Sequence, residues 1–151
     1  MERVKAMILG ASGLLGQALV REWKDASLSC PSSREVDIRD LGTIEAGVSS
    51  SRPEWIILSA AYTDVDGCET HPELAFSVNR DGALNVAKAA KQVGAKVLFL
   101  SSDYVFNGKK NSPYEIDDVR DPQSVYGRSK AEAEIRLLEM LPGKVPLPIG
   151  L

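Results

Sequence analysis

Short apolar runs alternate along this sequence with longer stretches in which apolar residues recur at helical spacing. Four runs predict strands, at residues 4–9, 26–30, 55–61 and 96–101. The last two runs contain no polar alternation, which is typical of strands that are covered on both faces. Strands that alternate with helices in this way predict a parallel, doubly wound sheet, so the expected fold class is α/β of the Rossmann type.

Three helices are expected around these strands. One should follow the first strand, where Leu15, Leu19 and Trp23 recur at helical spacing on one face. Another is expected from about residue 124 to 140, since residues 131–140 are rich in strong helix formers.

The third and longest helix should lie between the third and fourth strands. Thr70 and Glu73 fit a capping box, which places its start at about residue 70. Gly94 is a good C-terminal stop. Asp66 and Glu69 are then interpreted as acids of the preceding loop and helix start.

Composition narrows the class of protein. The 151 residues are 44% hydrophobic and 26% charged, as in one soluble globular domain. A net charge of -3 and scattered basic residues argue against nucleic acid or a membrane surface as a partner. Cys30 and Cys68 lie far apart, so free thiols in a reducing compartment are expected.

Two further observations point to a cytoplasmic protein without a bound metal. The apolar stretch near the N-terminus, residues 6–9, is too short for a signal sequence or a membrane span. His71 is the only histidine, which excludes a histidine metal cluster, and it is interpreted as a helix-start residue.

A glycine-rich turn joins the first strand to the first helix. Gly10, Gly13 and Gly16 form a G-x-x-G-x-x-G run between them. Glycine allows a tight turn and close approach of the backbone to a pyrophosphate, and the helix N-terminus supplies N–H donors for its oxygens. A plain strand-to-helix turn is the alternative, but the position after the first strand favours dinucleotide binding.

The segment after the second strand should contact the adenosine ribose of a dinucleotide and so select between NADH and NADPH. An acid there selects a free 2′-hydroxyl, whereas basic or small polar groups admit a 2′-phosphate. The sequence offers Ser32, Ser33 and Arg34, with no acid before Glu35. We therefore expect NADPH rather than NADH as the cofactor, with a merely solvated Arg34 as the alternative.

Tyr126 and Lys130 form a Tyr-x-x-x-Lys pair on one face of the helix expected at 124–140. A free phenol has a pKa of about 10, and a neighbouring ammonium lowers it toward the range useful for proton transfer. Ser102 follows the strand at 96–101, on the edge where doubly wound folds bind ligands, and its hydroxyl can bond a carbonyl oxygen. Ser102, Tyr126 and Lys130 together predict a catalytic site.

These motifs resemble the extended short-chain dehydrogenases and, within them, the dTDP-4-dehydrorhamnose reductases. The resemblance covers about residues 4–140 and is most specific at residues 60–66, 101–106 and 125–130. It implies NADPH-dependent reduction of the 4-keto group of dTDP-4-dehydro-L-rhamnose to give dTDP-L-rhamnose, with a dTDP-sugar as the bound partner. It leaves a homodimer open.

The resemblance also implies roles for individual residues. Gly13, Leu14 and Leu15 are expected to contact the pyrophosphate, and Asp37 and Ile38 to flank the adenine. The rest of the dinucleotide is expected to lie against Ala61, Tyr62, Thr63 and Tyr104. Ser102 and Asp103 are expected to face the sugar. Tyr126 is expected to protonate the sugar O4, and Lys130 to hold the nicotinamide ribose.

Two other functions are compatible with the same motifs. Ser102 replaces the threonine common in these reductases. The sequence of residues 101–106, Ser-Ser-Asp-Tyr-Val-Phe, also occurs in a non-catalytic relative, the regulatory beta subunit of methionine adenosyltransferase. Residues 61–66 resemble the bacterial-type reductases more closely. A non-catalytic dinucleotide-binding regulatory subunit and another extended-family epimerase or dehydratase of nucleotide sugars remain the alternatives.

The last eleven residues depart from the family pattern. Residues 141–151 contain three prolines, and proline cannot donate to a strand ladder. We expect residues 1–140 to form an NAD(P)-binding Rossmann-type domain, and residues 141–151 to be a divergent proline-rich tail. The sheet is then truncated and the C-terminal substrate lobe absent, so weak NADPH binding and slow turnover are expected of the isolated chain.

Overall fold

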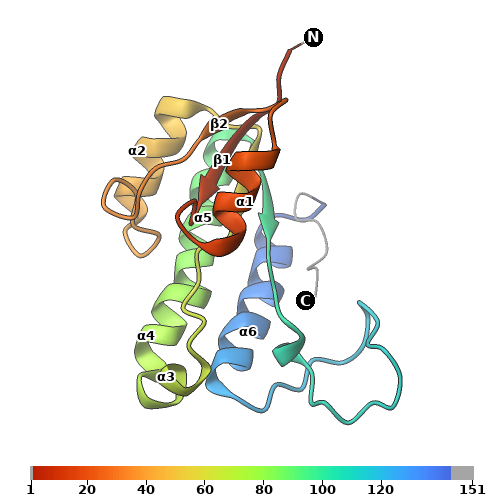
Figure 1. Cartoon of the computed structure of the whole chain (residues 1–151). Coiled ribbons are helices and arrows are strands. Elements are labelled where there is room, and N and C mark those ends of the chain that lie inside the picture. The colour runs from red at the N-terminus through yellow and green to blue at the C-terminus, as the bar shows by residue number, and fades with distance from the viewer. Residues whose placement is uncertain (1, 144–151) are drawn as a thin grey trace.

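Four parallel strands form one sheet in the computed structural model, which describes residues 2–143 (Figure 1). The strands are β1 (Lys5–Leu9), β2 (Ser27–Ser29), β3 (Trp55–Leu58) and β4 (Lys96–Phe99), and their order in the sheet is β2-β1-β3-β4. Each strand lies within one of the four expected apolar runs. The expected α/β fold with a parallel, Rossmann-type sheet is thereby confirmed.

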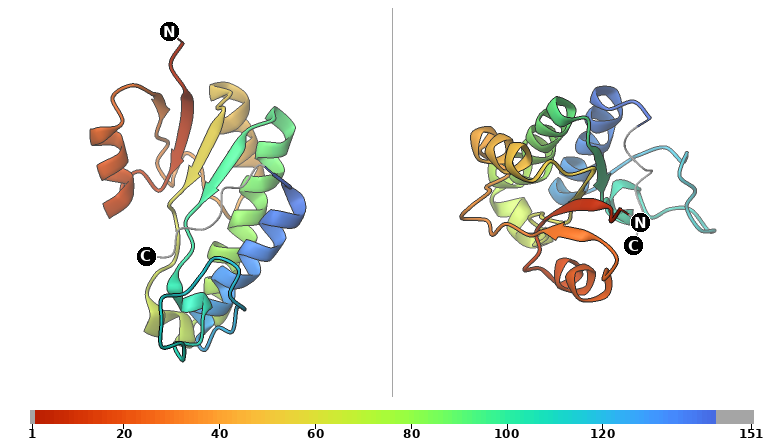
Figure 2. Two further views of the ribbon diagram at one scale, coloured as in Figure 1. Left: turned by 90° about the vertical axis from the view of Figure 1, so that its right-hand side faces the viewer. Right: turned by 90° about the horizontal axis from the view of Figure 1, so that it is seen from above.

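Helices cover the two faces of the sheet unequally (Figure 2). Three helices, α2 (Leu41–Ser51), α5 (Gly82–Val93) and α6 (Val125–Met140), pack on one face, and α1 (Leu14–Glu22) lies on the other. The strand residues that share the main core with the three helices alternate along β1, β3 and β4: Met7, Leu9, Ile56, Leu58, Val97 and Phe99. This alternation places the main core between the sheet and the three helices.

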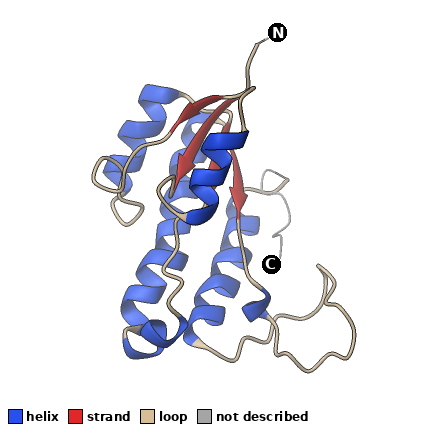
Figure 3. Ribbon diagram, in the orientation of Figure 1, coloured by secondary structure: helices blue, strands red, loops and turns tan. Residues whose placement is uncertain are grey.

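The segment between β3 and β4 differs from the single long helix that the sequence predicted. It contains α3 (Val65–Thr70), α4 (Pro72–Phe76) and a π-helical turn, η1 (Ser77–Asp81), before α5 (Figure 3). Asp64 starts α3 by accepting a hydrogen bond from Gly67 N at 3.0 Å.

The capping box expected at Thr70 is wrong. The Thr70 hydroxyl donates to Gly67 O at 3.0 Å and closes the end of α3, and His71 is the residue that precedes α4. The helix-start position expected for His71 is confirmed. Gly94, with φ of 72°, ends α5 in the left-handed conformation, as predicted.

Helix α2 was not predicted from the sequence. Asp40 begins α2 by accepting a hydrogen bond from Gly42 N at 2.9 Å, and Ile44 and Val48 are the buried residues on its inner face. Both signals are present in the sequence, an N-cap residue followed by apolar residues four apart.

A long loop leads from the short helix η2 (Asp103–Val105) to α6 and extends away from the sheet (Figure 1). Phe106 and Tyr114 stack within it at 4.3 Å between ring centroids. The Arg120 Nε donates to Glu134 on α6 at 2.8 Å and attaches the loop to that helix. The predicted tail at 141–151 lies, from residue 144 onward, outside the described residues.

Candidate cofactor and active site

The carboxyl ends of three strands meet at one edge of the sheet. The register pairs Leu9 of β1 with Leu58 of β3, and Leu58 with Phe99 of β4. The segments that follow these residues therefore emerge side by side. Because β2 and β3 lie on opposite sides of β1, this edge is the point where the strand order reverses, and doubly wound sheets bind ligands there.

A cavity of about 910 Å³ opens at this edge. Its lining comes from the glycine-rich turn after β1, the loop after β2 and the residues after β3, and includes Gly10, Ser12, Gly13, Ser32, Asp37, Ser59, Ala60 and Ala61. The volume lies in the range of small-molecule and cofactor sites.

The glycine-rich turn is built for close backbone approach. Gly10 has φ of 94°, and a Cβ there would lie 2.5 Å from the backbone N of Ala60. A Cβ on Gly16 would lie 2.1 Å from the carbonyl oxygen of Gly10. Gly13 precedes α1 and offers no side chain to its first-turn N–H groups. These donors and the positive end of the helix dipole therefore suit a pyrophosphate, so the residues fit a dinucleotide.

The end of the cavity expected to bind the adenosine carries polar side chains. Ser32, Asp37 and Ile38, which the sequence assigned to the cofactor, line it. Asp37 is paired with Arg39 at 2.8 Å, and that guanidinium lowers the pKa of the carboxyl. Arg34 is exposed and lies outside the lining, so the structure separates it from Ser32.

Other predicted cofactor residues flank the cavity. Leu14 and Leu15 are exposed in the first turn of α1, and Leu14 is 94% exposed. Ala61 lines the cavity, whereas Tyr62 and Thr63 continue beyond it toward α3. The structure thus brings the glycine turn, the loop after β2 and the start of the segment after β3 together.

Tyr126 is the second residue of α6, and its side chain is buried. Its ring packs edge-to-face against Tyr104, with the centroids 5.5 Å apart. Burial raises the pKa of the Tyr126 phenol, and a hydrogen bond with the Ser102 side chain partly opposes this rise. The sequence predicted that the Lys130 ammonium lowers this pKa, and that prediction is wrong: burial dominates, and the phenol stays protonated beside Ser102.

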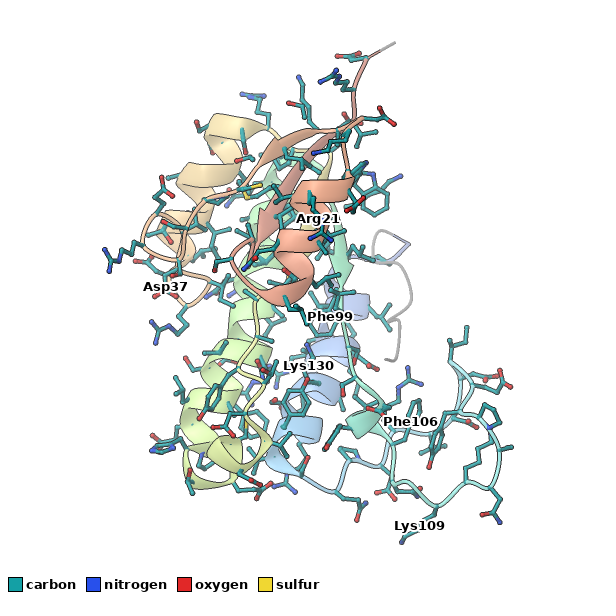
Figure 4. The ribbon with its side chains drawn as sticks, in the orientation of Figure 1. Arg21, Asp37, Phe99, Phe106, Lys109 and Lys130 are labelled. Atoms are coloured by element: carbon teal, nitrogen blue, oxygen red, sulfur yellow. The ribbon has the colours of Figure 1, made fainter. Side chains whose placement is uncertain are left out.

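Lys130 lies one turn further along α6, at the centre of Figure 4. Its Nζ donates to the carbonyl oxygen of Leu100 at 2.6 Å and lies 4.2 Å from the centroid of the Phe99 ring. Burial lowers the pKa of Lys130 to about 8, and the Glu134 carboxylate opposes this fall. The ammonium is thus close to the range in which it can exchange a proton.

Ser102 begins η2 directly after the β4 segment. Its Oγ accepts from Tyr104 N at 3.2 Å and donates to Asp103 Oδ1 at 3.3 Å. Ser102, Tyr126 and Lys130 come from two elements that are distant in sequence. The structure places Ser102 beside Tyr126 and bonds Lys130 to Leu100, next to β4, whereas none of the three side chains lines the cavity.

Two buried polar residues of the site were missed from sequence. Asn79, in the π-helical turn, accepts from Tyr62 N at 2.8 Å and donates to Tyr62 O and to Ser129 Oγ, both at 3.0 Å. Ser129 Oγ in turn donates to Tyr126 O at 2.7 Å. Asn79 therefore joins the segment after β3 to the helix that carries Tyr126 and Lys130.

Glu134 is the second missed residue. Its carboxylate is 4% exposed and accepts from the Ser101 hydroxyl and, at 2.8 Å, from Arg120 Nε. Because Lys130 and Glu134 are four residues apart, they lie on one face of α6 and hold two consecutive residues after β4. That spacing is the signal that could have identified Glu134.

Glu69 lies in the last turn of α3, so its interpretation as a loop or helix-start acid is wrong. Its Oε1 accepts from Val125 N, at the beginning of α6, at 2.7 Å. Asp66 lies in the first turn of α3, as expected of a helix-start acid.

Other chemistry finds little support in the residues that the structure describes. Between residues 2 and 143, no three His, Cys, Asp or Glu side chains gather in a way that could hold a metal ion. Cys30 is exposed and Cys68 is buried, both as free thiols. Within the same range, no helix combines the length and apolar character that crossing a membrane requires.

Lys130 is expected to make the folded chain more stable as the pH rises above about 8. Its pKa is about 8 when folded, against 10.5 for an ordinary lysine, so between these values the unfolded chain binds more protons. The contribution of Lys130 to the free energy of unfolding should therefore rise with pH across this window, by at most about 3 kcal/mol. It is obtained as the difference between the parent chain and Lys130→Met, because the raised pKa of Tyr126 acts in the opposite direction. Urea unfolding at several pH values measures it. Lys130→Met should remove the rise, and an equal rise in that variant would contradict the assignment.

Comparison with known families agrees with this geometry. The family model described as the RmlD substrate binding domain matches residues 4–145. The chain belongs to this family. Membership in the RmlD family confirms the resemblance to dTDP-4-dehydrorhamnose reductases that the motifs indicated.

Individual relatives of this RmlD-family chain carry different names. It is 37% identical to a dTDP-4-dehydrorhamnose reductase of Streptomyces griseus, over 93% of this chain and 47% of that protein. It is 36% identical to the methionine adenosyltransferase 2 subunit beta of Xenopus laevis, over 97% of this chain and 47% of that protein. The chain therefore spans about half the length of the curated relatives that it matches.

Solved structures show the same fold. The dTDP-4-dehydrorhamnose reductase of Bacillus anthracis str. Ames, solved in complex with NADP, superposes with a TM-score of 0.91 at 34% identity. That match covers 96% of this chain and 52% of that chain. The Bordetella bronchiseptica enzyme WbmG, solved with NAD and UDP, has a TM-score of 0.77 at 26% identity.

Proposed function

We propose that this chain supplies the cofactor-binding and proton-donating half of an NADPH-dependent reductase. The reaction is reduction of the 4-keto group of dTDP-4-dehydro-L-rhamnose to give dTDP-L-rhamnose. One observation carries the proposal: a glycine-cradled cavity and the trio Ser102, Tyr126 and Lys130 share one edge of the sheet. The names of the reductase relatives support the substrate, and the NADP in the Bacillus anthracis structure supports the cofactor.

The cavity residues have defined tasks toward the cofactor in this proposal. The first-turn N–H groups of α1, beginning at Leu14, bind the pyrophosphate, and Asp37 and Ile38 flank the adenine. Ala61 and the two residues after it line the remaining dinucleotide, and Lys130 holds the nicotinamide ribose. When bound, NADPH supplies the hydride for the carbonyl carbon; NADH supplies the same chemistry.

The protein side chains handle the proton. Tyr126 is protonated at neutral pH, as an ordinary phenol is, and burial raises its pKa further. Its Oη can therefore donate to the sugar O4 as charge develops there. Ser102 Oγ, beside Tyr126, donates to the same oxygen and stabilises that charge. The Lys130 ammonium favours the phenolate that Tyr126 becomes.

A binding and turnover assay tests this function. The purified chain should bind NADPH in calorimetry and, over a long incubation with dTDP-4-dehydro-L-rhamnose, form dTDP-L-rhamnose with one NADPH oxidised per product. An epimerised or dehydrated nucleotide sugar in place of the reduced one would contradict the proposal. The same result would favour the epimerase or dehydratase alternative.

A non-catalytic role is the second candidate. The observation that favours it is the 36% identity to the methionine adenosyltransferase 2 subunit beta of Xenopus laevis. In that case the chain should bind NADPH with no oxidation by any nucleotide sugar. It should then alter the activity of a partner enzyme, which an assay of that partner with and without the chain would detect.

A further inference from the structure

The loop after β2 contains a closed turn that faces the adenosine end of the cavity. Glu35 Oε2 accepts from the backbone N–H of Ser32 at 2.7 Å and from the Ser32 hydroxyl at 2.8 Å. The carbonyl oxygen of Ser32 accepts from Glu35 N at 3.0 Å and from Val36 N at 2.9 Å. These bonds fix a carboxylate on the cavity wall, where Ser32 and Glu35 both belong to the lining.

In doubly wound folds, the residues after the second strand contact the 2′ group of the adenosine ribose, and this wall is formed by those residues. The donors that a 2′-phosphate needs, an N–H and a hydroxyl, are present on Ser32, but both already bind the Glu35 carboxylate. The hydrogen bonds from Ser32 also lower the pKa of Glu35, so the side chain is anionic at neutral pH. A 2′-phosphate must compete with this carboxylate, whereas a 2′-hydroxyl can donate to it.

The cations of the cavity wall do not offset the carboxylate. Arg21 and Arg39 are the arginines of the lining, and both are paired: Arg21 with Glu22 at 2.6 Å and Arg39 with Asp37 at 2.8 Å (Figure 4 labels Arg21 and Asp37). Among the described residues that line the cavity, two basic side chains thus face two acidic ones, Glu35 and Asp37. The wall offers no surplus of positive charge to a second phosphate.

We propose that Glu35 sets the choice between the two nicotinamide cofactors by holding the Ser32 donors against a 2′-phosphate. NADPH binds only when the Glu35 carboxylate leaves Ser32, whereas NADH binds with the turn intact. This inference rests on the proposed dinucleotide site. It also revises the expectation that Ser32 and Arg34 alone decide the preference.

Glu35→Gln removes the charge and keeps the shape of the side chain. We expect NADPH to bind about fivefold more tightly to this variant, and NADH to change by less than about twofold, as for an exposed charge. Glu35→Ala, which frees both Ser32 donors, should shift the ratio of the two dissociation constants further. Added salt should reduce the difference, because it screens exposed charges.

Calorimetric titration of the full chain with NADPH, NADH, adenosine 2′,5′-bisphosphate and 5′-AMP measures these affinities without turnover. Glu139→Gln, an exposed acid on α6, is the control for loss of one negative charge and should leave the ratio unchanged. Equal changes for phosphorylated and unphosphorylated ligands, or no change, would overturn the role of Glu35 alone. Absence of binding by all four ligands to every variant would overturn the dinucleotide site itself.

Discussion

Replacement of Tyr126 by phenylalanine is expected to lower the rate of NADPH-dependent reduction by about 10²- to 10⁴-fold, the usual contribution of a positioned general acid. The substitution removes only the phenol oxygen that donates the proton. The ring keeps its burial and its edge-to-face contact with Tyr104, so the site should remain assembled. Oxidation of NADPH in the presence of dTDP-4-dehydro-L-rhamnose, followed by absorbance, measures the effect.

Two further measurements separate this loss from damage to the fold. The NADPH dissociation constant should stay within about threefold of the parent value. A proton donor acts in the transition state and contributes little to binding of the ground state. Tyr114→Phe makes the same chemical change in the loop after η2, where the phenol bonds Asn107 Oδ1 at 3.1 Å, and should leave the rate unaltered. Undiminished turnover in Tyr126→Phe would exclude this phenol as the acid.

The strands and the glycine turn were predictable because local physics decides them. Covered strands need unbroken apolar runs, and the turn at Gly10 and Gly16 has room for glycine alone. The placement of Tyr126 and Lys130 was predictable for a similar reason, since they are one helical turn apart and α6 is rich in helix formers.

Contacts between distant segments were the part that sequence alone could not supply. Asn79 and Ser129 are 50 residues apart, and Ser101 and Glu134 are 33 apart. The first pair nevertheless forms a buried hydrogen bond and the second a partly buried one. A buried polar side chain needs a partner, but neither the need nor the partner is visible in a hydrophobic pattern. The spacing of Lys130 and Glu134 indicates a shared helix face, but the partners of Glu134 and Asn79 are known only from the packed structure.

The loop after β2 illustrates a different limit. Ser32 and Arg34 are neighbours in the chain, so the sequence assigned both to the adenosine ribose. The turn closed by Glu35 on Ser32 instead faces Glu35 into the cavity and leaves Arg34 outside the lining. Side-chain direction in a loop depends on such turns, which have no periodicity from which to predict it.

Gly16→Ala is expected to destabilise the chain by about 3 kcal/mol and to weaken NADPH binding at least about tenfold. In a helix interior, alanine is normally the better residue by about 1 kcal/mol. Here its Cβ would lie 2.1 Å from Gly10 O and 2.6 Å from the Cα of Ala11, and both are backbone atoms that cannot rotate away. The turn must then move off the helix whose N–H groups serve the pyrophosphate.

Gly42→Ala is the matched control for this clash. Gly42 also lies in the first turns of a helix, α2, but its Cβ would meet only the Asp40 side chain, at 3.3 Å. That variant should be as stable as the parent chain or slightly more so, with unchanged NADPH affinity. Urea unfolding and calorimetry of the two variants give the comparison. If Gly16→Ala matched Gly42→Ala in both, the close packing of the turn against α1 could not be what forms the phosphate cradle.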